Sequence, residues 1–196
     1  LHVRSRRQRQ MCIRDRHLMN ELFEKKNLPF YKFGDAIYLA KIETKYWIEY
    51  ICKRFENTGK HISPELAEEI CRLVDNHSSY VQQLSWLLWI RTINTATTEQ
   101  LSYALEDLLD QNNILFQSET ENLSAYQMNF LKAIVDGIHT KFSSKEVISK
   151  YNLGTSANIV RLKNALLQKE LIETNGKEIV LADPVFGVWF KKEMLY

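Results

Sequence analysis

The sequence contains little cysteine, and its three cysteines show no arrangement that serves chemistry. Cys12, Cys52 and Cys71 are far apart, and none belongs to a CxxC pair or stands beside a pair of histidines. The spacings typical of a zinc site or a redox motif are therefore absent. We expect Cys52 and Cys71 to be small core hydrophobes in a reduced cytoplasmic protein, and we expect no metal site.

Long apolar runs are absent as well. The longest candidate, LSWLLWI at residues 84–90, is interrupted by a serine. It is far shorter than the roughly 20 residues that span a bilayer. We therefore expect a soluble protein without a membrane partner.

Motifs for phosphate transfer and hydrolysis are also missing. No GxxxxGK[ST] loop is present. The chain therefore lacks the loop whose backbone N–H groups and lysine side chain hold nucleotide phosphates. No apolar strand ends in paired acids, the usual magnesium site, and no Ser-His-Asp or Cys-His set is discernible. We expect no catalytic residue in this chain, no cofactor bound to it alone and no ATP hydrolysis by it.

Charged residues are unevenly distributed along the chain. Residues 1–16 hold six arginines and one acid, whereas residues 17–196 carry 20 basic and 23 acidic side chains. The net charge of +2 therefore comes from the first 16 residues, and the rest of the chain has a net charge of −3. Overall basicity consequently gives no support for a nucleic-acid partner.

The first 16 residues have two interpretations. MCIRD, at residues 11–15, is what ATG TGT ATA AGA GAC encodes, and it resembles the translated end of a sequencing adaptor. We therefore expect residues 1–16 to be an artefactual, disordered segment that contributes nothing to the fold. The alternative is a solvated basic arm that contacts nucleic acid or anionic lipid.

Helix signals dominate the rest of the chain, and two halves separate near residue 118. HLMNELFEKK predicts a short helix, and AIYLAKI predicts a brief β segment. Such a segment would have to pair with other strands of a sheet, and this chain offers few. Apolar residues three and four apart then predict an amphipathic helix over residues 44–57, which Gly59 ends.

Two further helices continue a bundle in the first half. Ser63 and Pro64 suit the cap and the first position of a helix in ISPELAEEICRLVDNH. SSYVQQLSWLLWIRT is apolar on most of its circumference, which predicts a helix in the middle of the bundle. We expect Trp86 and Trp89 to pack in the core, and a partner-binding patch is the alternative.

Polar caps predict the starts of three more helices. In a capping box, a Ser or Thr side chain and a Glu or Gln side chain three residues later satisfy each other's backbone N–H groups. The predicted boxes are Thr97 with Gln100, Ser124 with Gln127, and Ser143 with Glu146.

The second half has the element order of a winged helix. A long helix, TSANIVRLKNALLQKELI, follows the turn YNLG, and LIETNGKEIVL predicts a hairpin around Asn175-Gly176, since both residues accept φ > 0. Helix, helix, turn, helix and hairpin are typical of a winged helix-turn-helix domain. The expected class is mainly α: a helical bundle followed by a winged helix-turn-helix domain with a small β-hairpin.

The long helix of the second half has two faces. Its apolar face predicts packing against the preceding helices, and its polar face suits a DNA major groove. Residues 123–196 carry ten basic and seven acidic side chains, which is only a slight positive excess compared with the clustered charge of a DNA-binding surface. We therefore expect this face to pack within the protein, with DNA binding as the alternative. The residues that would contact DNA, including one in the hairpin turn, are Asn158, Arg161, Asn164, Gln168 and Lys177.

Four segments in order resemble one protein family. DNHSSYVQQLSWLLW, LSAYQMNFLKAI, YNLGTSANIVRLKNALLQKELIE and LADPVFGVWFKK look like the C-terminal portion of the archaeal-type ATPases, P-loop NTPases of the AAA+/STAND group. The similarity covers nearly everything from His17 onward. It implies that residues 17–42 are a remnant of the ATPase core domain, residues 43–117 a helical lid bundle, and residues 118–196 the winged-helix domain.

The resemblance also implies a place for a nucleotide. The family's lid helix often begins with a Gly-His-Pro-Tyr-Tyr-like turn near the bound nucleotide, and residues 76–80 match it in the histidine and the last tyrosine only. His77 and Tyr80 are then expected at the edge of the adenine or ribose, with structural roles in the bundle as the alternative. ATP and magnesium would bind to the intact parent, and the missing N-terminal ATPase domain would be the partner of this chain.

The resemblance therefore implies a nucleotide-dependent switch. The chain would be the lid and winged-helix fragment of an ATP-binding ATPase, and its winged helix would pack within the protein or contact a protein partner or DNA. Two alternatives are a stand-alone winged-helix regulator that binds DNA and a structural protein-interaction module.

Overall fold

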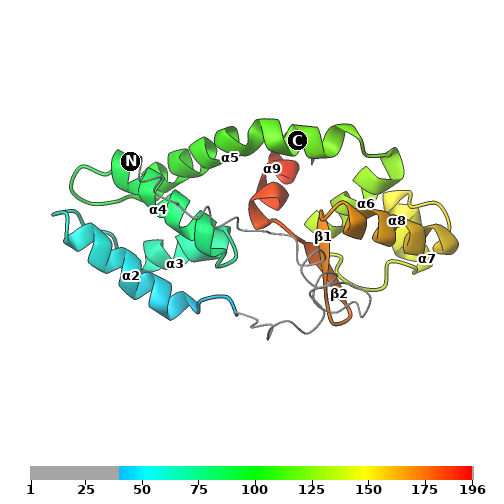
Figure 1. Ribbon diagram of the computed structural model, residues 1–196, viewed down its shortest axis with the longest axis horizontal. Coiled ribbons are helices and arrows are strands. Elements are labelled where there is room, and N and C mark those ends of the chain that lie inside the picture. Colours follow the sequence, from blue (N-terminus) through cyan, green and yellow to red (C-terminus); the bar gives the residue numbers. More distant parts are fainter. Residues whose placement is uncertain (1–39, 196) are drawn as a thin grey trace, which may run out of the picture. The chain divides into compact units, whose positions relative to one another are not determined.

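The computed structural model describes residues 40–195, and those from Lys41 onward belong to one compact unit. Helices dominate this part of the chain, together with a two-stranded antiparallel sheet (Figure 1). The mainly α class is therefore confirmed. In chain order the elements are α2 (Thr44–Glu56), α3 (Pro64–Leu73), α4 (Ser78–Arg91), α5 (Thr98–Glu121), α6 (Ala125–Val135), α7 (Lys145–Tyr151), α8 (Ser156–Gln168), β1 (Ile172–Asn175), β2 (Glu178–Leu181) and α9 (Pro184–Leu195).

Several predictions for the amino end fall outside the described residues. These are the nature of residues 1–16, the helix HLMNELFEKK and the first four residues of AIYLAKI. The last three residues of that segment, 40–42, precede α2 without regular secondary structure. The domain limits expected at residues 16 and 42 stay predictions.

The first helices form where apolar spacing and caps predict them. On α2, Trp47, Ile51 and Phe55 are buried, three or four residues apart on one side of the helix. Helix α3 begins with a proline in its first position, and the Ser63 Oγ accepts a hydrogen bond of 3.2 Å from the backbone N–H of Leu66.

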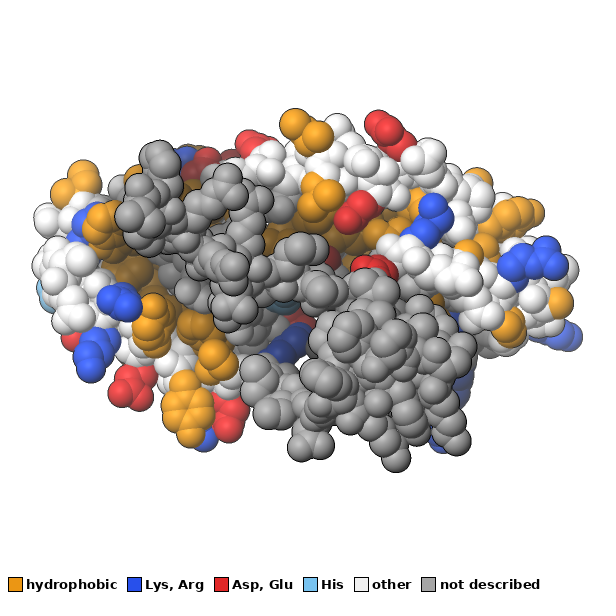
Figure 2. All heavy atoms as spheres, viewed as in Figure 1, with side chains coloured by type: hydrophobic (Ala, Val, Ile, Leu, Met, Phe, Trp, Pro, Cys, Tyr) orange, Lys and Arg blue, Asp and Glu red, His pale blue; other side chains and the backbone are white. Residues whose placement is uncertain are grey.

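The expectation that both tryptophans of α4 pack in the core is wrong for Trp86. Its side chain is 57% exposed, and Ile90, one turn later on the same side of the helix, is exposed too. Helices α3 and α5 cover the opposite side of α4. Trp89 is half-buried, and its indole N–H donates to the hydroxyl of Thr58 over 2.9 Å. Figure 2 shows hydrophobic side chains at the surface over α2–α4.

Helix α5 is the longest of the described helices. Its 24 residues begin at the expected capping box, in which the backbone N–H groups of Thr97 and Gln100 each donate to the other's side chain. The helix continues to Glu121 because residues 112–121 contain neither glycine nor proline, and Phe116 is buried. Residue 118, where the two halves were expected to separate, lies inside α5.

The next two helices confirm one predicted cap and correct another. Ser124 and Gln127 form the expected capping box at α6. At α7, however, the cap is Ser144, whose Oγ accepts a hydrogen bond of 3.3 Å from the Val147 backbone N–H. The helix therefore begins one residue later than the pairing of Ser143 with residue 146 predicts, and that capping box does not form.

This shift in the α7 cap has a measurable consequence. Ser144→Ala removes the cap and should lower the free energy of unfolding by about 1 kcal/mol. The matched change Ser143→Ala removes an exposed hydroxyl and should alter stability by less than about 0.5 kcal/mol. Urea denaturation of the two variants measures both values, and equal effects would contradict the assignment of Ser144 as the cap.

The predicted hairpin is present, but its turn is shifted by one residue. Asn175 pairs with Glu178 in the antiparallel ladder, so Gly176 and Lys177 are the two central residues of the turn. Gly176 adopts φ +61°, as the first central position of a type II′ turn requires, whereas Asn175 keeps a negative φ as the last residue of β1. The expectation that Asn175 and Gly176 are the central pair is therefore wrong.

The C-terminal helix α9 packs against both halves of the described chain. It contacts α5, α6 and β2, and Figure 1 shows it between α5 and the hairpin. The rings of Phe186 and Trp189 are buried against the ring of Phe116 on α5, at centroid distances of 5.5 and 5.6 Å. The Trp189 indole N–H also donates to the side-chain oxygen of Asn113 over 2.8 Å. Helix α9 thus joins the bundle to the winged helix.

Candidate functional site

Helix α8 presents a polar face to solvent. Ile159, Leu162 and Leu166 are buried, and they fix which side of the helix faces the core. The opposite side carries three exposed polar residues, which we call the α8 polar face: Arg161, Asn164 and Gln168. The two-faced helix predicted from the sequence is therefore present.

Asn158 differs from the other predicted contact residues. It is half-buried at the edge of the helix, and its side-chain amide donates a hydrogen bond of 3.1 Å to the backbone carbonyl of Leu153. It also lies close to Gly154, whose φ of +83° shapes the turn between α7 and α8. The amide of Asn158 thus holds this turn, an interaction that the helical spacing alone does not indicate.

Lys177 lies exposed in the turn of the hairpin, which is the wing of the domain. Within residues 40–195, neither Lys177 nor Arg161 takes part in an ion pair. Both cations are therefore accessible to an anion such as a phosphate or a carboxylate.

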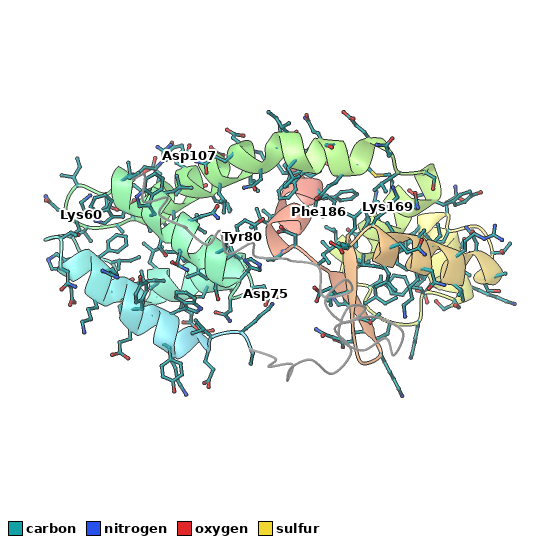
Figure 3. All side chains as sticks on the ribbon, in the orientation of Figure 1. Lys60, Asp75, Tyr80, Asp107, Lys169 and Phe186 are labelled. Carbon is teal, nitrogen blue, oxygen red and sulfur yellow. The ribbon has the colours of Figure 1, made fainter. Side chains whose placement is uncertain are left out.

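His77 and Tyr80 lie at the start of α4, as the resemblance implies, but Tyr80 has a structural partner. His77 is the residue before the helix, and its ring lies 4.8 Å from the ring of Tyr80. Tyr80 is only 4% exposed, and its hydroxyl donates a hydrogen bond of 2.5 Å to the Oδ2 of Asp183. Figure 3 labels Tyr80 on α4 and Phe186 on α9, the helix that follows Asp183.

Asp183 uses both of its carboxylate oxygens. Oδ1 accepts from the backbone N–H groups of Val185 and Phe186, at 2.9 and 3.2 Å, and so caps the first turn of α9. Oδ2 accepts from Tyr80. Neither helical periodicity nor a capping box singles out this residue, although Asp-Pro before an apolar run is a typical helix start.

A hollow of about 440 Å³ lies beside Asp75 and Asn76, just before α4, and four of the eight described residues that line it are acidic. It includes Glu65, Glu68 and Glu69, the last of which pairs with Arg72. Repulsion from these carboxylates makes it a poor site for nucleotide phosphates. Cys71, one of the lining residues, is fully buried, as expected for a core thiol, and its burial raises its pKa to about 11.

Residues 40–195 contain neither a recognisable metal site nor a membrane-spanning helix. No group of three or more His, Cys, Asp or Glu residues in this range has the arrangement of a metal site. None of the helices in the same range combines the length and the apolar character needed to cross a bilayer.

Comparisons with known proteins agree with this architecture. Residues 114–192 match the family model described as a probable winged helix domain, so this part of the chain is a winged helix domain. A Walker-type ATPase of Pyrococcus abyssi has a similar structure, with a TM-score of 0.66 and 17% sequence identity over 89% of this chain. The chain spans 50% of the length of that ATPase chain. No curated protein matches the sequence.

Proposed function

We propose that the chain acts as the lid bundle and winged-helix part of an ATP-dependent switch protein. The observation that carries this proposal is the fold similarity to half of a Walker-type ATPase, which takes in 89% of the chain. The phosphate-binding loop and the magnesium site would belong to the ATPase domain, since neither motif occurs in this sequence.

The contacts around Tyr80 suggest how such a switch would use this chain. A nucleotide held between the ATPase domain and the bundle would change the contacts of His77 at the start of α4. Tyr80, one turn later, is hydrogen-bonded to the cap of α9. The two nucleotide states would differ in their contacts with this end of α4. A shift there would alter the packing of α9 and therefore the position of the winged helix.

The proposal predicts a difference between the chain and an intact protein. Calorimetry with Mg-ATP should show a dissociation constant above about 1 mM for the chain alone. A longer protein, in which residues 17–196 follow the polypeptide that the genome encodes upstream of them, should bind Mg-ATP with micromolar affinity. That upstream sequence should encode a GxxxxGK[ST] loop. A start codon near residue 17, or micromolar one-to-one binding by the chain alone, would contradict the proposal.

The role of the α8 polar face is a separate part of the proposal. We place the ATPase domain against this face, because the basic residues of 123–196 are scattered along the segment and are not gathered on α8. DNA binding is the second candidate function, and it is favoured by the exposed cations Arg161 and Lys177.

A binding selection from random DNA duplexes at physiological salt distinguishes these two roles. We expect only weak binding without a sequence preference, and no specific loss on Arg161→Ala. For a DNA-binding regulator, the same change should weaken binding by about 1–3 kcal/mol and relax the preference at one base, whereas Lys177→Ala should weaken all sequences alike. A sharp motif that depends on Arg161 would overturn the packing role.

A further inference from the structure

A groove of about 420 Å³ opens at the surface between α6, β2 and α9. The described residues that line it do not include those of the α8 polar face. The residues that α9 contributes recur at three and four residues, so they form one side of that helix. We call this surface the α9 groove, and six of the residues that line it are Val135, Leu181, Gly187, Val188, Lys191 and Lys192.

The floor of the α9 groove is apolar although α9 already has a buried face. Phe186 and Trp189 fill the core on one side of the helix, and Val188 faces the groove on the other. A Cβ atom at Gly187 would lie 2.7 Å from the Cδ1 of Leu181, so glycine allows α9 to lie close to β2. A surface helix usually turns polar residues outward, and a concave apolar surface is typical of a binding site.

The charge at the end of the α9 groove is positive. Lys191 and Lys192 are exposed, and neither forms an ion pair within the described part of the chain. Among the described residues, those that line the groove include no acidic side chain. An apolar floor that ends in two cations complements a segment whose apolar side chains are followed by carboxylates. An open groove of this kind suits a peptide segment better than an enclosed small molecule.

We propose that the α9 groove binds an acidic amphipathic helix of a partner protein. Apolar side chains of the partner lie on Val135, Leu181 and Val188, and its carboxylates pair with the two lysines. This interaction needs neither a nucleotide nor the α8 polar face, so it stands independently of the switch proposed above.

The test uses the full chain and a fluorescein-labelled peptide of about 14 residues, whose leucines recur at helical spacings of three and four and are followed by glutamates toward one end. Fluorescence anisotropy should show saturable binding that weakens as salt rises. Lys191→Ala combined with Lys192→Ala should weaken binding at least about tenfold. The matched pair Lys145→Ala and Lys169→Ala removes the same charge from exposed sites outside the groove and should change binding less than about twofold.

Two further measurements test the charge and the apolar floor of the α9 groove separately. A peptide with lysines in place of the glutamates should bind at least about tenfold more weakly. Val188→Asp should also weaken binding of the acidic peptide while circular dichroism shows an unchanged helix content, because the change places an acid on the apolar floor. Equal binding of the two peptides, equal losses in the two double-lysine variants, or no saturation below about 1 mM would overturn the proposal. Self-association that these substitutions abolish would overturn it too, and would assign the groove to a second copy of the chain.

Discussion

Replacing Trp189 with alanine should lower the free energy of unfolding by about 3–5 kcal/mol, the largest effect we expect from a single substitution. The indole is 1% exposed and packs on Phe116 and Phe186, so its removal leaves a cavity between α5 and α9. It also leaves the side-chain oxygen of Asn113 without the hydrogen bond it receives from the indole. Urea denaturation followed by far-ultraviolet circular dichroism measures the change.

Met194 provides the matched control on the same helix. Its side chain is 41% exposed, so Met194→Ala should change stability by about 0.5 kcal/mol at most. If the two alanine variants unfold at the same urea concentration, α9 does not depend on Trp189 and the described packing of α9 on α5 is wrong. If the slope of the unfolding free energy against urea concentration is unchanged in both variants, unfolding still exposes the same surface area.

Asp183→Ala should lower the free energy of unfolding by about 2–4 kcal/mol, because it removes two different interactions. Loss of the cap from the first turn of α9 costs about 1 kcal/mol, and leaving the buried hydroxyl of Tyr80 without this acceptor costs about 1–3 kcal/mol. Glu193→Ala removes an exposed acid from the same helix and should change stability by less than about 0.5 kcal/mol.

A double-mutant cycle separates the two interactions of Asp183. Tyr80→Phe removes only the hydroxyl, and we expect a loss of about 1 kcal/mol. In the double variant with Asp183→Ala, the combined loss should fall short of the sum by at least about 0.5 kcal/mol, since the hydrogen bond between α4 and α9 can be lost only once. Additive losses would show that this hydrogen bond contributes nothing to stability.

Local signals in the sequence predicted most of the helix starts. The caps at Ser63, Thr97 and Ser124 act within three residues of their partners, so the sequence contains the whole interaction. The α7 cap was misassigned because residues 143 and 144 are both serines, and only the backbone path decides which hydroxyl reaches an N–H group. The hairpin turn was shifted for a similar reason, since Asn175 and Gly176 both suit a turn but only strand register fixes its centre.

Interactions between distant segments could not be predicted in this way. Tyr80 and Asp183 are 103 residues apart in the sequence, and no periodic pattern connects them. The exposure of Trp86 depends on which sides of α4 its neighbours cover, whereas the apolar composition of α4 suggests burial all round. For the candidate site, helical spacing placed the α8 polar face correctly but did not show that the amide of Asn158 is bound to Leu153.

The uninterrupted length of α5 has a mechanical consequence. An α-helix advances about 1.5 Å per residue, so its 24 residues extend over about 36 Å. In its first half, Gln100 and Asp107 are bonded to Arg91 of α4, and in its second half Asn113 and Phe116 contact α9. A rod of this length acts as a lever: a tilt of about 10° at one end displaces the other end by about 6 Å. A tilt of this size in the bundle would therefore move the opposite end of α5 by slightly more than the pitch of a helix, about 5.4 Å.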